Sequence, residues 1–183
     1  MSPMFFPSGA KFLGKTTPLA AQASSTPVLV FGPGYEWLLI YHYIAGYSSS
    51  GGIARLQFGT ATTVDTGTNY SWVAQNATSS ATATAYSTNV SAGGIGVGKT
   101  AVTSGRRGQH MVWNPTTDPK FIDSRTITFG GTAPVSAAST HTSIDQTMGN
   151  WWQNSEAQCA AMDAGGTVQL LSGSYISVYG VPR

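Results

Sequence analysis

The run Thr167-Val-Gln-Leu-Leu-Ser-Gly-Ser-Tyr-Ile-Ser-Val-Tyr-Gly180 decides the fold class of this chain. Two stretches rich in branched and aromatic residues flank a Gly-Ser turn, which is typical of strand, tight turn and strand. Similar short apolar or alternating runs, separated by Gly, Pro, Asn and Ser, recur through most of the sequence. The sequence therefore predicts an all-β protein.

About eight to ten short strands are expected, a number that suits an antiparallel β-sandwich of jelly-roll type. The strongest candidate spans residues 36–45, whose near-continuous apolarity predicts that both faces are covered. A second candidate, residues 53–58, alternates between apolar and polar side chains. The remaining candidates are residues 28–31, 70–74, 82–86 as an edge strand, 110–113, 121–129, 168–171 and 175–179.

One segment carries two conflicting signals. Residues 151–162 contain good helix formers behind Asn150, a suitable N-cap, so intrinsic propensity favours a short helix. The surrounding sequence is β-patterned, and we therefore favour strand or irregular structure for residues 157–162.

Residues 1–27 are expected to form an extended N-terminal arm ahead of a single β-sandwich domain, residues 28–183. Four prolines oppose a helix in the arm, and its second half is small and polar. Its apolar side chains either cover an open end of the domain's own core or dock on a neighbouring subunit. These side chains are Phe5, Phe6, Phe12 and Leu13.

The composition favours a folded chain with an unusual surface. Only 9% of the 183 residues are charged, the net charge is +2, and 11% are aromatic. Aromatic content of this order opposes disorder, and a surface poor in charge suits large, tightly packed contacts because few charges are desolvated. The small charge gives no indication of nucleic-acid binding, and no apolar run approaches the ~20 residues of a membrane span. The N-terminus lacks the pattern of a signal peptide, so synthesis in a cytoplasm is expected.

Residues 93–100, Gly-Gly-Ile-Gly-Val-Gly-Lys-Thr, match the phosphate-loop pattern letter for letter. A phosphate loop needs a buried strand before it and a helix after it, and neither flanking stretch has that character. The chain contains 22 glycines, so such a match arises easily. We interpret the segment as a surface loop with an exposed lysine, and expect no nucleotide or other cofactor.

No pattern for catalysis or metal binding is present. His42, His110 and His141 are far apart and lack carboxylates or cysteines at metal-ligand spacing, and Cys159 is the only cysteine. A Ser-His-Asp site assembles from distant residues, so spacing does not exclude one, but the nucleophile-elbow pattern is absent. His42 alternates within an apolar strand and is read as a core or interface histidine. We expect no enzyme activity and no metal.

Two further motifs have a structural and a functional interpretation. Arg106 and Arg107 lie in a short basic turn, which is either solvated or meets an acidic partner. Trp151 and Trp152 either pack in a core or interface, or form a platform on which sugars stack.

Several segments resemble a β-sandwich domain found in virion proteins of tailed bacteriophages. The resemblance rests on Tyr35-Glu-Trp-Leu-Leu-Ile40, on Ile53-Ala-Arg-Leu-Gln-Phe-Gly59, and on Asp65-Thr-Gly-Thr-Asn-Tyr-Ser71. Members of that family tend to show R-L-R-F-N followed by D-x-G-x-N-Y-S, and to end in G-S-x-x-x-L/V-Y-G. Gly173-Ser174 with Val178-Tyr179-Gly180 matches that ending, and Lys11-Phe-Leu-Gly-Lys-Thr-Thr17 resembles the family's N-terminal entry. The asparagine that usually follows the middle strand is Gly59 here.

The resemblance implies a virion structural component without catalytic residues. It is expected to be a capsid decoration or cement protein, or a tail-associated one, made in the host cytoplasm and located in the virion. The implied partners are other copies of itself, with a trimer as one form, and major capsid or tail subunits. The docking residues would be Phe5, Phe6, Phe12, Leu13, Arg106 and Arg107. The alternative is a tail- or fibre-associated module that binds host glycans through Trp151 and Trp152.

Overall fold

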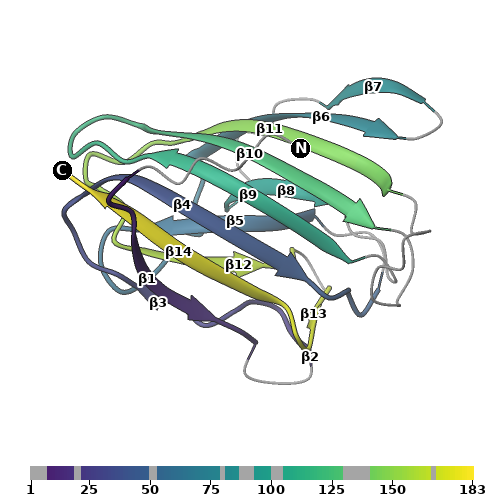
Figure 1. Ribbon diagram of the computed structural model, residues 1–183, viewed down its shortest axis with the longest axis horizontal. Helices are drawn as coiled ribbons and strands as arrows, with labels where there is room; N and C mark the ends of the chain where they lie inside the picture. Colours follow the sequence, from purple (N-terminus) through teal and green to yellow (C-terminus); the bar gives the residue numbers. More distant parts are fainter. Residues whose placement is uncertain are drawn as a thin grey trace.

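The computed structural model describes residues 8–18, 22–49, 53–78, 81–86, 93–99, 105–129, 141–165 and 168–183. These residues form strands and no helix, which confirms the all-β prediction. A large sheet and a small sheet, both antiparallel, lie as two layers of a β-sandwich (Figure 1).

The large sheet has eight strands, and the small sheet has four. The large sheet runs in the order β1 (Lys11–Thr16), β14 (Tyr175–Pro182), β4 (Tyr35–Ile44), β9 (Arg106–Trp113), β10 (Lys120–Phe129), β11 (His141–Trp151), β6 (Tyr70–Thr78) and β7 (Ala81–Tyr86). The small sheet runs in the order β3 (Leu29–Val30), β12 (Cys159–Asp163), β5 (Ile53–Gly59) and β8 (Ile95–Lys99). A further pair joins β13 (Leu170–Leu171) to β2 (Gln22–Ala23).

The core lies between the two layers, where alternate residues of each strand point inward. From the large sheet it receives Ile40, Val112 and Ile122, and from the small sheet Phe58 and Met162, all essentially buried. Trp151 lies among them and packs on the ring of Phe58 at a centroid distance of 5.8 Å. The two layers therefore share one continuous hydrophobic core.

Most of the expected strands are present, and Ala81–Tyr86 lies at an edge as predicted. No helix forms over residues 151–162; that stretch contains the end of β11, irregular structure and β12. β1 and β2 lie in the segment expected to be an arm. Beyond it, two of the observed strands had no sequence signal, because β8 is rich in glycine and β11 contains Asp, Gln, Gly and Asn. The closing segments 170–171 and 175–182 flank a turn as expected, but they pair with β2 and with β1 and β4 rather than with each other.

Part of the expected arm belongs to the domain's own sheet. Residues 11–16 form β1, which pairs with β14 along its length. Phe12 lies against the ring of Tyr179, and Leu13 packs against the core, so apolar contact holds this strand to the sheet edge. The jelly-roll topology stays a prediction. A jelly roll pairs two sheets of similar size, whereas this sandwich pairs eight strands with four.

Candidate interaction surface

A row of aromatic side chains crosses the outer face of the large sheet, the face that points away from the small sheet. Trp37 of β4 pairs in register with Trp113 of β9, and Trp113 pairs with Phe121 of β10. Phe121 in turn pairs with Asn150 of β11. We call Trp37, Trp113 and Phe121 the aromatic row; both tryptophans are half-buried and Phe121 is 44% exposed.

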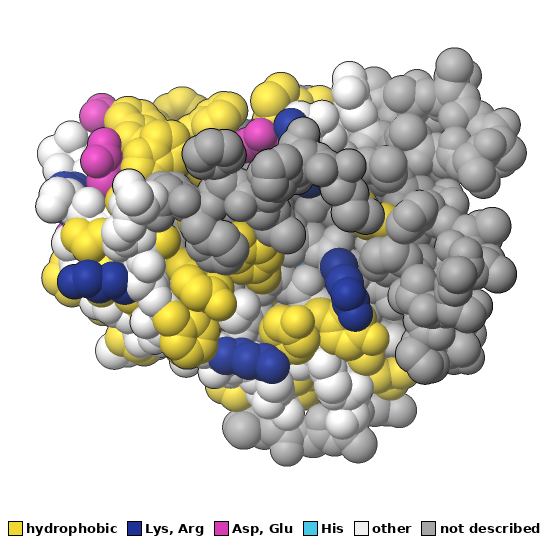
Figure 2. All heavy atoms as spheres, in the orientation of Figure 1, with side chains coloured by type: hydrophobic (Ala, Val, Ile, Leu, Met, Phe, Trp, Pro, Cys, Tyr) yellow, Lys and Arg dark blue, Asp and Glu magenta, His cyan; other side chains and the backbone are white. Residues whose placement is uncertain are grey.

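A second row runs parallel to the first, one pleat further along the strands. Met111 of β9, Asp123 of β10, Met148 of β11 and Val73 of β6 follow one another in register. Met111 and Met148 are 43% and 47% exposed. Single exposed apolar side chains are ordinary on protein surfaces, but contiguous ones indicate an interaction surface. Together the two rows define what we call the outer patch, and Figure 2 shows hydrophobic side chains gathered on this face.

The outer patch contains two shallow hollows, one on each side of Phe121. The first is lined by Trp37, Trp113, Pro119, Phe121 and Asn150, and the second by residues of β6, β10 and β11 that include Val73 and Met148. Both hollows are walled mainly by apolar groups, so they suit apolar side chains better than ions.

Two opposite charges lie beside the apolar part of the patch. Asp123 and Arg125 are two residues apart on β10 and, with Gln109 and Met111, line a third hollow. Within the described part of the chain, the Oδ1 atom of Asp123 is buried and accepts no hydrogen bond. A buried oxygen of this kind favours a partner that brings a donor group.

The inner face of the same sheet carries a buried polar cluster. His42 of β4, His110 of β9 and Ser124 of β10 lie on neighbouring strands, although their sequence separation gave no sign of contact. The distance from His42 Nδ1 to His110 Nε2 is 2.7 Å, and that from His110 Nδ1 to Ser124 Oγ is also 2.7 Å. The two imidazole rings stack with their centroids 4.9 Å apart. The interpretation of His42 as a core histidine agrees with this position.

Burial keeps both histidines neutral at ordinary pH. Burial holds the pKa of His42 well below its ordinary value, and the neighbouring His110 and Arg106 add to the effect. Burial also lowers the pKa of His110 to about 3. Among the described residues, no group bonds His42 Nε2. Protonation of His42 would place a second positive charge in the core near Arg106.

The distances between His42, His110 and Ser124 resemble those of a catalytic relay, but a substrate could not reach these side chains. A serine nucleophile must reach a substrate, and its histidine must exchange protons with that substrate. Ser124 is 1% exposed and His110 is 0% exposed, and both lie between the layers of the sandwich. The arrangement therefore orients core side chains and leaves no room for a reacting molecule.

Asp65, the first residue of the motif 65–71, is the centre of a structural network. Its Oδ2 atom accepts hydrogen bonds from the indole of Trp151 at 3.0 Å, from Asn69 at 2.8 Å and from Gln153 at 3.2 Å. Its Oδ1 atom accepts the backbone N–H of Gly67 at 2.8 Å. Burial raises the pKa of this carboxyl, but these donors outweigh it and bring the pKa below its ordinary value. These hydrogen bonds give Asp65, Gly67 and Asn69 of the motif a structural role.

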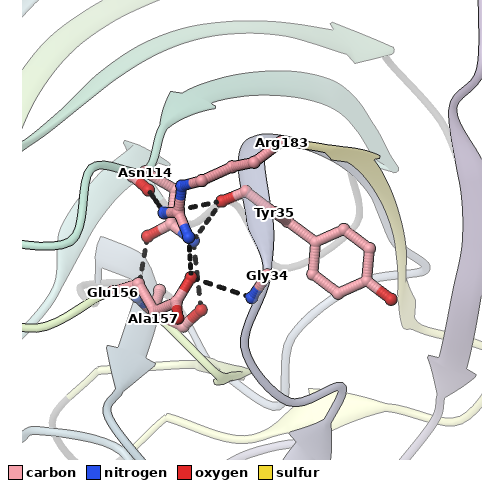
Figure 3. Close-up of polar contacts among 6 residues, drawn as sticks. All are labelled: Gly34, Tyr35, Asn114, Glu156, Ala157 and Arg183. Carbon is pink, nitrogen blue, oxygen red and sulfur yellow. Dashed lines mark hydrogen bonds and ion pairs between the residues drawn. The ribbon is translucent and has the colours of Figure 1, made fainter.

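A second polar network closes one end of the sandwich (Figure 3). The buried Asn114 donates to the carbonyls of Tyr35 and Ala157 and accepts the N–H of Ala157. Arg183 forms an ion pair with Glu156 at 2.8 Å and donates to the carbonyl of Asn114 at 2.6 Å. These bonds tie β4, β9 and β14 to the segment that precedes β12.

The structure scatters the predicted docking residues. Phe5 and Phe6 lie outside the described residues. Phe12 is 60% exposed at the sheet edge, while Leu13 packs against the core. Arg106 is 4% exposed, because it points to the inner face of β9, whereas Arg107 is exposed and lies over the ring of Tyr43. Arg106 therefore does not fit a solvated turn that meets a partner.

The two predicted sugar-stacking residues differ in exposure. Trp151 is 0% exposed, since its ring lies in the core and its indole N–H bonds Asp65, so it offers no face to a sugar. Trp152, the next residue, is 57% exposed. Alternation along the strand end explains why only one of the pair is available.

The glycine-rich segment is described for residues 93–99, and most of it is strand β8 rather than a loop. Ile95 is fully buried and packs in the core, which explains why the segment is extended. Among the described residues, no group of three or more His, Cys, Asp or Glu is placed to hold a metal ion. The described part of the chain also has no helix long and apolar enough to cross a membrane.

Sequence reasoning missed the outer patch. Alternation in residues 121–129 puts Phe121, Asp123 and Arg125 on one face, and this mixture of aromatic and charged groups was the available signal. Alternation does not reveal whether that face is covered, nor that Trp113 and Met148 lie beside it.

Comparison with known proteins adds no relative: no family model, no curated protein and no solved structure matches this chain.

Proposed function

We propose that this protein is a non-enzymatic structural protein that associates with neighbouring subunits through the outer patch. The observation that carries the proposal is the contiguous set of exposed apolar side chains on the large sheet, with Met111, Phe121 and Met148 each more than 40% exposed. Interfaces are enriched in aromatic residues and methionine, which the aromatic row, Met111 and Met148 supply here. Asp123, between the two methionines, is the one charged residue of the two rows.

The sequence resemblance to tailed-phage virion proteins supports the setting. In that setting the chain acts as a capsid decoration or cement protein, in contact with copies of itself and with capsid or tail subunits. A charge-poor chain, with 9% charged residues, suits that role because little charge is desolvated when subunits pack together. A neighbour that brings a donor to Asp123 would also satisfy its buried oxygen.

A matched pair of substitutions tests the proposal. Met148→Asp places a charge in the outer patch, and Val30→Asp places one at an equally exposed site on the small sheet, since the two residues are 47% and 49% exposed. We expect Met148→Asp to reduce self-association in sedimentation velocity at high concentration, and to reduce binding to undecorated phage particles. Val30→Asp should leave both unchanged. Equal behaviour of the two variants would contradict the proposal.

Glycan binding is a second candidate function, favoured by the 57% exposure of Trp152. Exposed aromatic rings serve as stacking surfaces for apolar faces of ligands. Titration of the protein with a broad panel of glycans, followed by tryptophan fluorescence, tests this candidate. A response that disappears in Trp152→Ala would support it, and the absence of any response would oppose it.

A further inference from the structure

We propose that the hollow beside the aromatic row binds the N-terminal segment of the same chain, with the Phe5-Phe6 pair as the inserted residues. This proposal concerns the isolated chain; a neighbouring subunit that binds the whole outer patch would have to displace the segment from the aromatic row, whereas Met111 and Met148 do not line this hollow. The proposal gives a specific binding site to Phe5 and Phe6, which precede the first described strand.

The chemistry of the hollow calls for an apolar occupant. Trp37, Trp113, Pro119 and Phe121 form its walls, and Asn150 adds an amide side chain. Rings inserted here would bury aromatic surface on both sides, and the amide of Asn150 would be available to a backbone group of the occupant. The segment Met1-Ser-Pro-Met-Phe-Phe-Pro7 has two adjacent phenylalanines and no charged side chain.

The chain enters the large sheet level with the aromatic row. Lys11 pairs with Gly180 in β14, so the residue before it lies level with Val181, which pairs with Trp37. A turn at residues 8–9 immediately precedes β1, and Gly9 has a φ of 97°, a conformation that favours glycine. The chain therefore changes direction beside the row before it joins the sheet.

The distances allow the segment to reach the hollow on its own subunit. Neighbouring strands are about 4.8 Å apart, which places β4 about 10 Å and β9 about 14 Å from β1 along the sheet. Phe5 lies four residues before Gly9 (9 − 5), where the chain turns, and an extended chain of that length spans about 14 Å. Trp37 and Trp113 are thus within reach. Gln75 on β6, six strands away from β1, lies about 29 Å away and is out of reach.

Paired cysteines test the contact and include a matched control. Phe5→Cys combined with Trp113→Cys joins the segment to the hollow, and Phe5→Cys combined with Gln75→Cys joins it to an unreachable exposed site on the same face. The native Cys159 is fully buried and does not interfere. Tethered groups have effective concentrations in the millimolar range, so at ~10 µM protein a bond within one chain is favoured about a hundredfold over one between chains.

We expect the first pair to form a disulfide within the monomer, at a rate independent of protein concentration, and the control pair to form none. Equal trapping in both pairs, or trapping only between chains, would overturn the proposal; the latter would mean that a neighbour supplies the segment.

A second measurement avoids altering the hollow. In a Trp152→Phe background the accessible tryptophans are Trp37 and Trp113, because Trp72 and Trp151 are 7% and 0% exposed. Replacing Phe5 and Phe6 by Ser should then increase quenching of fluorescence by acrylamide. Unchanged quenching would overturn the proposal even if the cysteine variants failed to fold.

Discussion

Acid should destabilise this protein at a pH above the one at which Asp65 titrates, because the pair His42 and His110 is buried in neutral form. His110 has a pKa of about 3 in the folded chain against an ordinary value of 6.5. The unfolded chain therefore binds more protons than the folded chain in this interval, so stability is complete above pH 6.5 and falls as the pH is lowered. Burial shifts the pKa of His42 in the same direction.

The size of the effect follows from the difference in pKa. One pKa unit corresponds to about 1.4 kcal/mol, so between pH 7 and pH 5 His110 alone should remove about 2 kcal/mol of unfolding free energy. Below pH 3 its contribution would reach about 5 kcal/mol, with that of His42 in addition. The interval from pH 7 to pH 5 is the most informative, since Asp65, whose pKa is lowered from 3.8, stays ionised there.

Urea unfolding at pH 7 and pH 5 measures this loss directly. The double variant His42→Gln and His110→Gln removes both titrating groups while retaining groups that form hydrogen bonds, and its unfolding free energy should change much less between the two pH values. The reasoning would be refuted by a wild-type midpoint that is equal at pH 7 and pH 5, or by a double variant with the same pH dependence as the wild type.

Three further substitutions have defined outcomes. Asp65→Ala removes the acceptor for Trp151, Asn69 and Gln153 and should lower the unfolding free energy by about 2–4 kcal/mol in urea titration; wild-type stability would show that the network is dispensable. Gly108→Ala adds a methyl group that overlaps the His42 ring and should cost about 1–3 kcal/mol, measured as a lower thermal midpoint. Trp152→Ala removes a 57% exposed ring and should leave the thermal midpoint within about 1–2 °C of the wild type; a larger fall would mean that the ring packs against the domain.

The sequence predicts local structure well here because alternation and turn residues are local signals. Residues 36–45 are recognisable as a buried strand, and β4 spans Tyr35–Ile44. No local pattern in the sequence reveals the order of the strands across a sheet, because that order depends on pairings between distant segments. The contact between His42 and His110 exists because β4 and β9 are neighbours, and no spacing pattern indicates this. The same limit explains why Trp37, Trp113 and Phe121 were not recognised as one row.

Propensity fails where burial decides the conformation. The glycine-rich segment 95–99 has the composition of a loop, yet Ile95 anchors it as a strand of the small sheet. Residues 159–163 include alanine and methionine, both good helix formers, but Ala160 and Met162 point into the core while the backbone pairs with β5. Tertiary packing therefore overrides the weak intrinsic preferences of both segments.

We expect the outer patch to support assembly only when several contacts are made at once. Full burial of a large apolar side chain contributes about 1.5–3 kcal/mol, so covering the exposed parts of Met111, Phe121 and Met148, each a little under half, contributes about 2–4 kcal/mol. Association costs at least about 4 kcal/mol in lost freedom of motion, so one such contact gives at most a weak association that is detectable only at high protein concentration. Several contacts made at once on a repetitive surface would hold the subunits more tightly, because each later contact is intramolecular. We therefore expect the isolated protein to be monomeric at low micromolar concentration and to bind tightly to an ordered lattice. A stable dimer in dilute solution would show that the patch is supplemented by a stronger contact.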